Sequence, residues 1–226
     1  MNISLSNLLA PHYCTSCGEI GDVLCEYCKY DIVEDRYAQC IVCRRIVNGN
    51  TNLCSSCQEP FVRAWCVGER QETLRTLIDN LKFERARVVY KACGDLLDRV
   101  IPVLPPNTVV TYVTTAAPDI RRRGYDHAAL IAQDFAKRRH LTLARTIDRP
   151  VYRRQFGASR RERIANAKES IVVTKTLSPV PYLLIDDVYT TGATLARASA
   201  ELQRAGAREV YAAVIARQPL EKLTHI

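Results

Sequence analysis

The sequence has no apolar run long enough to cross a membrane. A spanning helix needs roughly 18 consecutive apolar residues, and the longest runs, at 182–185 and 210–216, are far shorter. The first ten residues contain no basic side chain, so we expect no secretory signal and a cytoplasmic location. Charged residues make up 25% and hydrophobic residues 47% of the chain, which is typical of globular proteins. Membrane-spanning, collagen-like and intrinsically disordered classes are therefore excluded.

Acidic residues are scarce in one central stretch. Residues 118–168 contain 14 basic and 5 acidic side chains, a net charge of +9, whereas residues 1–117 and 169–226 have net charges of −1 and 0. The whole surplus of +8 therefore lies in this stretch, largely in two clusters of arginine. Arginine is well shaped for bidentate contacts to phosphate, although a solvated helix face is the simpler explanation of a single run. Two clusters favour a phosphate-rich ligand, namely pyrophosphate, a nucleotide or a nucleic acid.

Cysteine, by contrast, is abundant near the start of the chain. Eight of the ten cysteines form four pairs with two residues between partners, namely Cys14/Cys17, Cys25/Cys28, Cys40/Cys43 and Cys54/Cys57. Each pair can present two thiolates to one metal ion, and two pairs complete a tetrahedral zinc site. Four pairs predict two structural zinc ions in a double zinc ribbon. The spacing leaves open which pairs share an ion, and sequential pairing is the simplest arrangement.

Other chemistries of paired cysteines fit this pattern less well. Disulfides require an oxidising compartment, and no export signal is visible. A redox dithiol needs one pair beside a β-α-β unit, and iron–sulfur clusters usually have different spacings. We expect the isolated Cys66 and Cys93 to be small buried hydrophobic residues.

The rest of the chain alternates between helical and strand patterns. Strands are predicted at 108–115, 181–188 and 209–217. Helical regions are predicted at 70–101, 126–139, 160–168 and 193–205. We expect residues 61–68 to be a linker, residues 149–159 to be a mobile loop, and Gly206 to cap the preceding helix. The alternation predicts an α/β fold with a buried parallel sheet.

The most specific pattern is YLLIDDVYTTGAT at 182–194, in which an apolar strand leads through two acids and a Thr/Gly turn into a helix. Such a turn directs backbone N–H groups and the positive end of the helix dipole into one space, so it binds an anion. Gly192 lets the backbone approach a phosphate, and the hydroxyls of Thr190, Thr191 and Thr194 can donate to its oxygens. A polar turn with an N-capping threonine is the simpler alternative.

Asp186 and Asp187 lie at the carboxyl end of this predicted strand, where open α/β sheets bind their ligands. Acidic side chains do not favour a phosphate, but they suit ribose hydroxyls or a nearby Mg²⁺. The spacing is that of neither a Walker A loop nor a G-x-G-x-x-G dinucleotide turn.

Four segments and the cysteine pairs together resemble the ComF family, in which a cysteine-rich zinc ribbon precedes a type I phosphoribosyltransferase domain. IDDVYTTGAT at 185–194 resembles the motif that binds 5-phosphoribosyl 1-pyrophosphate (PRPP) in type I phosphoribosyltransferases. LIDNLKF at 77–83, RRRGYDHAALIA at 121–132 and RRQFGASRRERIAN at 153–166 resemble further segments of the family. The resemblance covers about residues 8–217.

The resemblance implies a fold and a division of the chain. The expected fold is a type I phosphoribosyltransferase-like parallel sheet flanked by helices, with a small N-terminal four-cysteine zinc-ribbon module. The module would comprise residues 1–60, and the phosphoribosyltransferase-like domain residues 61–226.

The resemblance also implies roles for individual residues. Asp186 and Asp187 would be the catalytic acids, holding the ribose hydroxyls of PRPP close to Mg²⁺. The whole PRPP-binding segment would be Asp186, Asp187, Val188, Tyr189, Thr190, Thr191, Gly192, Ala193 and Thr194. The pyrophosphate would lie near Arg121, Arg122 and Arg123. The flexible hood that closes over the site would be the segment from Arg153 to Arg163, with Arg153, Arg154, Gln155 and Arg163 as its site residues.

Three residues depart from the pattern of the family. Tyr125, Asp126 and His127 stand where Phe, Asn and Gln are commoner. Asp126 either adds a negative charge beside the expected anion site or caps the following helix. His127 is either an acid–base group or a residue of the surface or of a helix cap.

Three kinds of function are compatible with these features. The first is a phosphoribosyltransferase that displaces pyrophosphate at ribose C1, with PRPP or a related phosphorylated ribose as its substrate. The second is an adaptor in DNA uptake during natural competence, which would bind single-stranded DNA or a competence helicase. The third is a regulator that senses PRPP. We expect a PRPP-binding, phosphoribosyltransferase-like protein that acts in DNA uptake, with the adaptor and the regulator as alternatives. Nothing in the sequence identifies an acceptor base.

Overall fold

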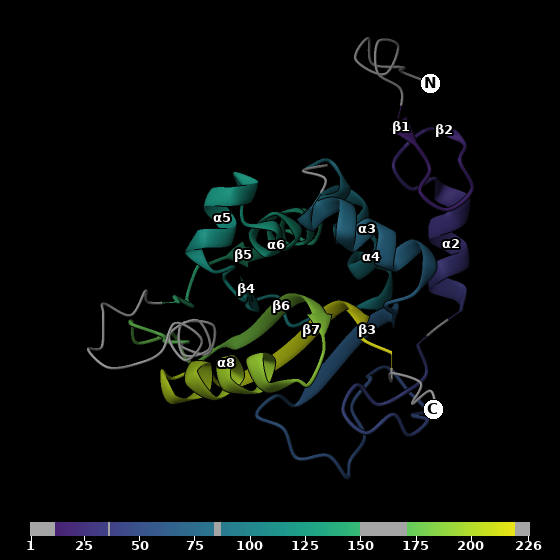
Figure 1. Cartoon of the computed structure of the whole chain (residues 1–226). Helices are drawn as coiled ribbons and strands as arrows, with labels where there is room; N and C mark the ends of the chain where they lie inside the picture. Colours follow the sequence, from purple (N-terminus) through teal and green to yellow (C-terminus); the bar gives the residue numbers. More distant parts are fainter. Residues whose placement is uncertain (1–11, 36, 84–86, 150–170, 220–226) are drawn as a thin grey trace, which may run out of the picture.

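The computed structural model describes residues 12–35, 37–83, 87–149 and 171–219 (Figure 1). Within these residues, five strands form one parallel sheet in the order β3-β7-β6-β4-β5. The strands are β3 (Arg63–Glu69), β4 (Val109–Tyr112), β5 (Thr142–Leu143), β6 (Pro181–Tyr189) and β7 (Glu209–Arg217). The expected class, a parallel α/β sheet flanked by helices, is confirmed.

Helices cover both faces of this sheet, with α8 on one side and α3, α4 and α6 on the other (Figure 1). These helices are α3 (Glu72–Lys82), α4 (Val89–Val100), α6 (His127–Arg138) and α8 (Ala193–Arg204). Side chains of each strand alternate between the two faces, so Leu183 and Ile185 pack with the three helices and Leu184 packs with α8. Burial on both faces explains why the central strands are apolar throughout.

The strands and helices predicted from the longer apolar patterns are present, with small changes of bounds. The strand predicted at 209–217 is β7, with the same bounds. The strand predicted at 181–188 is β6, which is one residue longer, and the strand predicted at 108–115 is β4, which is shorter. The helical region at 70–101 is two helices, α3 and α4, rather than one. Helix α8 ends at Arg204, and the following Gly206 has a positive φ of 114°. Helix α5 (Ala117–Arg123), with Pro118 in its first turn, was not predicted.

The expected linker at 61–68 was wrong, because most of it is strand β3. Its segment RAWCVGE pairs in parallel with β7 over six registered positions, from Arg63 with Tyr211 to Glu69 with Arg217. Trp65 and Val67 face one hydrophobic cluster and Ala64 and Cys66 the other. The expected mobile loop and the short helix at 160–168 fall outside the described residues, apart from Arg149.

The cysteine-rich region forms two lobes that share the hydrophobic clusters of the sheet. The first lobe contains the hairpin β1 (His12–Tyr13) and β2 (Ile20–Gly21) and helix α2 (Glu26–Glu34). In the first lobe, Cys14, Leu24 and Cys28 join the hydrophobic cluster under α3 and α4. In the second lobe, Ile41 and Phe61 join the cluster under α8. The first lobe therefore lies beside α3 and α4, and the second packs into the cluster on the opposite face of the sheet (Figure 1). The boundary at residue 60 stays a prediction.

A buried carboxylate holds the first lobe against α4. Asp95 on α4 is 8% exposed and accepts hydrogen bonds from Lys29 of α2 at 3.0 Å and from Arg138 of α6 at 3.0 Å. Arg99 approaches the same carboxylate at 3.3 Å and Glu26 of α2 at 2.5 Å. Burial opposes ionisation, but the hydrogen bond from Lys29 and the charges of Arg99 and Arg138 hold the pKa of Asp95 below its usual value.

None of the helices in the described part of the chain has the length and apolar character that crossing a bilayer demands.

Replacing Asp95 should destabilise the protein, because Asp95→Ala removes the buried carboxylate that Lys29, Arg99 and Arg138 share and leaves Lys29 only the exposed carboxylate of Glu26. We expect a loss of about 3 kcal/mol in the free energy of unfolding, measured in urea. Asp119→Ala, which removes the exposed pair with Arg122, is the control and should cost no more than about 1 kcal/mol. Equal losses in the two variants would show that Asp95 is not a docking residue.

The same carboxylate predicts the sign of a pH effect. A carboxyl whose pKa is lowered in the folded state stabilises above its unfolded pKa, about 3.9, and loses that contribution as the pH falls through its folded pKa. We therefore expect the stability of the wild type to decline below about pH 4 more steeply than that of Asp95→Ala.

Candidate functional site

Two groups of four cysteines stand close enough together to share a metal ion each. Within the described residues, the groups are Cys14, Cys17, Cys25 and Cys28, and Cys40, Cys43, Cys54 and Cys57. The sulfur atoms within each group lie within 4.8 Å of one another. The expected sequential pairing is therefore the arrangement found.

The sulfur separations fit zinc rather than disulfides. Cys17 and Cys25 are 3.7 Å apart, Cys43 and Cys54 are 3.6 Å apart, and Cys40 and Cys57 are 3.9 Å apart. Four thiolates placed tetrahedrally at about 2.3 Å from Zn²⁺ stand about 3.8 Å apart, whereas a disulfide requires about 2.05 Å. All ten cysteines are free thiols. The donor set and its spacing thus fit two structural zinc ions.

The two clusters are built on the same turn. The N–H of Gly18 donates to the carbonyl of Cys14 at 2.8 Å, and the N–H of Arg44 donates to the carbonyl of Cys40 at 2.9 Å. Both residues have positive φ, 78° for Gly18 and 64° for Arg44. In each cluster a backbone N–H also points at a thiolate, from Cys25 in the first and from Cys54 in the second. Such N–H groups stabilise thiolate over thiol.

The acidic pair lies at the carboxyl end of the central strand β6, as predicted. Asp187 is buried and Asp186 is half-buried, and the N–H of Asp187 donates to Oδ1 of Asp186 at 2.8 Å. Burial and the neighbouring Asp187 carboxylate raise the pKa of Asp186 to about 8. Two adjacent acids therefore have different proton affinities, and Asp187 is the one that stays ionised.

Two side chains from other helices hold Asp187 in its ionised form. Nε2 of His127, the first residue of α6, is 2.9 Å from Oδ2 of Asp187, and Lys82, the last residue of α3, pairs with the same oxygen. Burial alone would raise the pKa of Asp187, but the hydrogen bond from His127 and the charge of Lys82 together lower it well below its usual value. Both contacts use Oδ2.

The partners of His127 fix its tautomer. Nη1 of Arg123 lies 3.0 Å from Nδ1 of His127, and Thr115 Oγ1 lies 3.2 Å from the same nitrogen. A guanidinium can only donate, so Nδ1 accepts and the proton of the neutral ring is on Nε2, from which it is donated to Asp187. The four groups form one chain, in the order Arg123, His127, Asp187 and Lys82.

Asp126 caps helix α6 and does not stand free beside an anion site. Its Oδ1 accepts from the N–H groups of Ala128 at 3.1 Å and Ala129 at 3.3 Å, and from the hydroxyl of Thr115 at 2.8 Å. Of the two expectations for Asp126, the cap is correct. The expectation that His127 is a surface or capping residue was wrong, since it is 6% exposed and bonded to Asp187.

The predicted phosphate-binding turn connects β6 to α8. Thr190 and Thr191 are exposed, and Gly192 is the N-cap of α8 with a φ of 81°. A side chain at Gly192 would collide with the phenol of Tyr189, which lies buried under the turn. The first N–H groups of a helix have no carbonyl partner within it, and here the N–H of Ala193 donates to Oγ1 of Thr191 at 3.4 Å.

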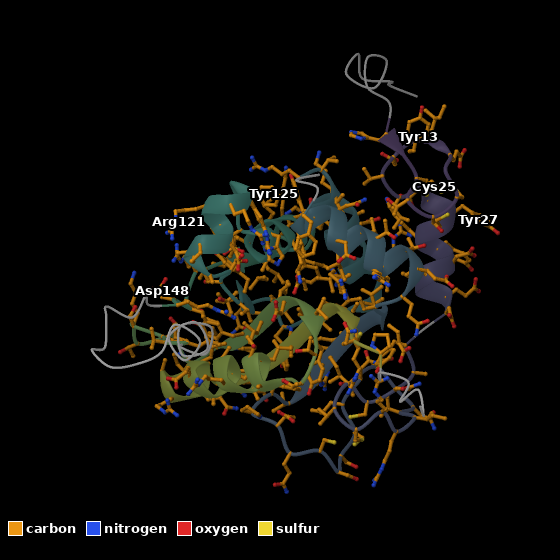
Figure 2. All side chains as sticks on the ribbon, in the orientation of Figure 1. Tyr13, Cys25, Tyr27, Arg121, Tyr125 and Asp148 are labelled. Atoms are coloured by element: carbon orange, nitrogen blue, oxygen red, sulfur yellow. The ribbon has the colours of Figure 1, made fainter. Side chains whose placement is uncertain are left out.

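The arginines of the central stretch separate into two groups. Arg123 points inward to His127, whereas Arg121 and Arg122 lie exposed on α5, with Arg121 at its outer surface (Figure 2). The aromatic ring of Phe83 lies beside the guanidinium carbons of Arg122 and Arg123, at 6.0 and 5.9 Å. Arg153, Arg154, Gln155 and Arg163 of the expected hood fall outside the described residues.

Lys82 was not singled out as a site residue in the sequence. It is the lysine of LIDNLKF, a segment already noted for its resemblance to the family, and it is a cation in the last turn of an amphipathic helix. Arg149, four residues before the expected hood, also contributes a positive charge near Asp186. The two isolated cysteines behave as expected, because burial raises the pKa of Cys66 and Cys93 to about 12.

Comparison with known proteins supports the kinship indicated by the motifs. The chain is 28% identical over 210 residues to Competence protein F of Haemophilus influenzae, covering 86% of this chain and 90% of that protein. It is 26% identical to DNA utilization protein YhgH of Escherichia coli and of Salmonella typhi, covering 83% of this chain and 93% of each of those proteins. No model of a protein family matches the chain. The resemblance to ComF-type proteins is thus confirmed.

Similar solved structures are more distant. Glutamine PRPP amidotransferase from B. subtilis is 18% identical with a TM-score of 0.43, over 61% of this chain and 30% of that one. A hypoxanthine phosphoribosyltransferase from Staphylococcus aureus is 16% identical with a TM-score of 0.35, over 63% of this chain and 68% of that one.

The two cysteine clusters predict a metal stoichiometry. We expect two zinc ions per chain by elemental analysis of the purified protein, because each cluster supplies a complete set of four thiolates. Removing the metal with a chelator should release eight thiols to a thiol reagent, while the buried Cys66 and Cys93 react only on unfolding. A content of one ion or none would refute the two-site assignment.

Proposed function

We propose that this protein binds PRPP together with Mg²⁺ at the carboxyl end of the sheet, and that it acts in the handling of incoming DNA. The observation that carries the first part is the position of two acids, Asp186 and Asp187, directly before the Thr190–Thr194 turn at the start of α8. A sugar that bears a phosphate needs both features, since acids suit its hydroxyls and a helix start suits its phosphate.

The charges around Asp187 support a polyanionic ligand. Lys82 and Arg123 outweigh the one ionised acid, Asp187, in the absence of ligand, so the proposed site does not repel phosphate as an isolated acidic pair would. Because Lys82 and His127 both use Oδ2 of Asp187, we propose Oδ1 as the acceptor for a ribose hydroxyl. Asp186 would hold Mg²⁺, which favours carboxylate oxygens and supplies charge for a leaving pyrophosphate.

The role in DNA handling is supported by the relatives, which are named for competence and for DNA utilization. It is also supported by the exposed Arg121 and Arg122 on α5, within the stretch that holds the whole positive surplus of the chain. Exposed arginines suit contacts to the phosphates of single-stranded DNA. A competence helicase is a further proposed partner.

PRPP binding can be tested by titration calorimetry with the zinc-loaded protein, with and without Mg²⁺. We expect Mg²⁺-dependent binding in the wild type and a loss of about tenfold or more in Asp187→Asn and in Lys82→Met, since each removes one charge of the buried pair. Glu201→Gln, at the far end of α8, is the matched control and should bind as the wild type does.

Absence of PRPP binding to a protein with two bound zinc ions would overturn the first part of the proposal. Pyrophosphate release that depends on an added nucleobase would identify an enzyme. In that reaction the C1–O bond to pyrophosphate breaks, a C1–N bond to the base forms, and the base loses a proton. Binding without release would favour the PRPP-sensing regulator.

DNA binding should depend strongly on salt, because arginine contacts to phosphates release counterions. We expect the affinity for an oligo-dT strand, measured by fluorescence anisotropy, to fall as salt is raised, and the slope to decrease in the Arg121→Gln/Arg122→Gln variant. Arg204→Gln/Arg208→Gln, which changes the net charge equally on exposed arginines elsewhere, is the control. Equal slopes in both double variants would remove α5 from the DNA-binding surface.

A further inference from the structure

The second cysteine cluster lies against the carboxyl end of the sheet, beside the proposed phosphate-binding turn. Its contact runs through Arg217, the last residue of β7, which stands next to Tyr189, the last residue of β6, in the register of the two strands. Arg217 is 7% exposed, so its charge must be satisfied by protein groups.

Arg217 binds the loop between Cys40 and Cys43. Its Nε donates to the carbonyl of Ile41 at 2.5 Å and its Nη2 to the carbonyl of Val42 at 3.0 Å. Its third nitrogen, Nη1, donates to the carbonyl of Gln218 at 3.1 Å. The guanidinium also lies over the ring of Tyr189, at 5.3 Å from the ring centre. One side chain therefore joins the cysteine loop to the end of β6.

Arg44 forms a second link from the same loop. Its guanidinium donates to Glu69 at the end of β3, at 2.9 Å, and to the carbonyl of Gln218 at 2.5 Å. Arg44 occupies the left-handed turn position that Gly18 occupies in the first cluster. A non-glycine residue in that conformation costs about 1 kcal/mol, which its side-chain contacts offset.

Both links reach the turn through Tyr189. The N–H of Gln218 donates to the carbonyl of Tyr189 at 2.8 Å. The phenol of Tyr189 fills the space under Gly192, so the ring supports the backbone that begins α8. The first cysteine lobe has no comparable path among the described residues, since its ion pairs lead to α4 through Asp95 and Arg99.

We propose that Arg217 and Arg44 are positioning residues through which the second four-cysteine cluster holds the Thr190–Thr194 turn in its phosphate-binding form. Loss of metal from that cluster releases the Ile41 and Val42 carbonyls from their fixed position, and the Tyr189 ring and the turn lose their support. The expected effect on PRPP affinity rests on the proposed function. The support of the turn by the second cluster does not require any ligand.

The structural part is tested by hydrogen–deuterium exchange at the backbone amides of 190–194 in the full-length, zinc-loaded protein. We expect Cys43→Ser, which breaks the second cluster, to speed exchange there roughly tenfold or more, and Cys17→Ser, which breaks the first, to do so far less. Zinc content must fall from two ions to one in both variants. Equal acceleration, or none, would overturn the proposal.

Two variants separate the links from the metal itself. Arg44→Gly keeps the positive φ without strain and removes only the anchor, and Arg217→Lys keeps the buried charge but cannot donate to three carbonyls in one plane. Both should keep two zinc ions and still show faster exchange at 190–194. Arg208→Lys, exposed just before β7, is the matched control and should exchange as the wild type does.

Calorimetry with Mg²⁺ and PRPP then tests the consequence. We expect affinity to fall about tenfold in Arg217→Lys and in Arg44→Gly. If the wild type does not bind PRPP, the proposed function fails while the exchange result still decides the link. If the wild type and both variants bind PRPP with the same affinity and exchange at 190–194 at the same rate, the proposed support of the turn by Arg217 and Arg44 is refuted.

Discussion

Neutralising the buried carboxylate of Asp187 is the constraint on which the rest of the site depends. A lone charge at the end of a central strand would be strongly destabilising, so the fold must bring partners to it. Those partners come from the last residue of α3 and the first residue of α6, which packs on the same face of the sheet. The helices are thus placed by electrostatics at their ends as well as by the apolar contacts along their length. The same pairing leaves a site without a net negative charge, which is the condition for accepting a phosphorylated sugar beside two acids.

The order of the chain Arg123, His127, Asp187 and Lys82 has a chemical consequence. Because Arg123 can only donate, Nδ1 of His127 accepts from it and Nε2 donates to Asp187. The function of His127 is therefore to orient a carboxylate, and an acid–base step at this ring would first require Arg123 to move. Asp126, one residue earlier, caps the helix that carries His127 and binds Thr115, so it fixes the position of the ring through the backbone.

The sequence predicted those features that depend on local patterns. The four cysteine pairs, the apolar strands β6 and β7 and the turn into α8 each have a signal within about a dozen residues. Strand β3 was not predicted, because its seven residues contain Trp and Cys with charges at both ends and follow directly on the cysteine region. The partnership of Lys82 and His127 with Asp187 could not be predicted either. Both residues lie 60 or more positions before Asp187, and only the packing of α3 and α6 on one face of the sheet brings them to it.

The two cysteine clusters are alike in spacing but differ in what surrounds them. Where the first has Gly18, which adopts a positive φ freely, the second has Arg44 in the same strained conformation. The strain is offset only because the side chain reaches Glu69 and the carbonyl after β7, and these are groups of the sheet and not of the cluster. A turn that needed only to bind metal would be more stable with glycine. The second cluster is therefore bonded to the carboxyl edge of the sheet through Arg44 and Arg217. The first lobe is bonded instead to α4, by ion pairs around Asp95.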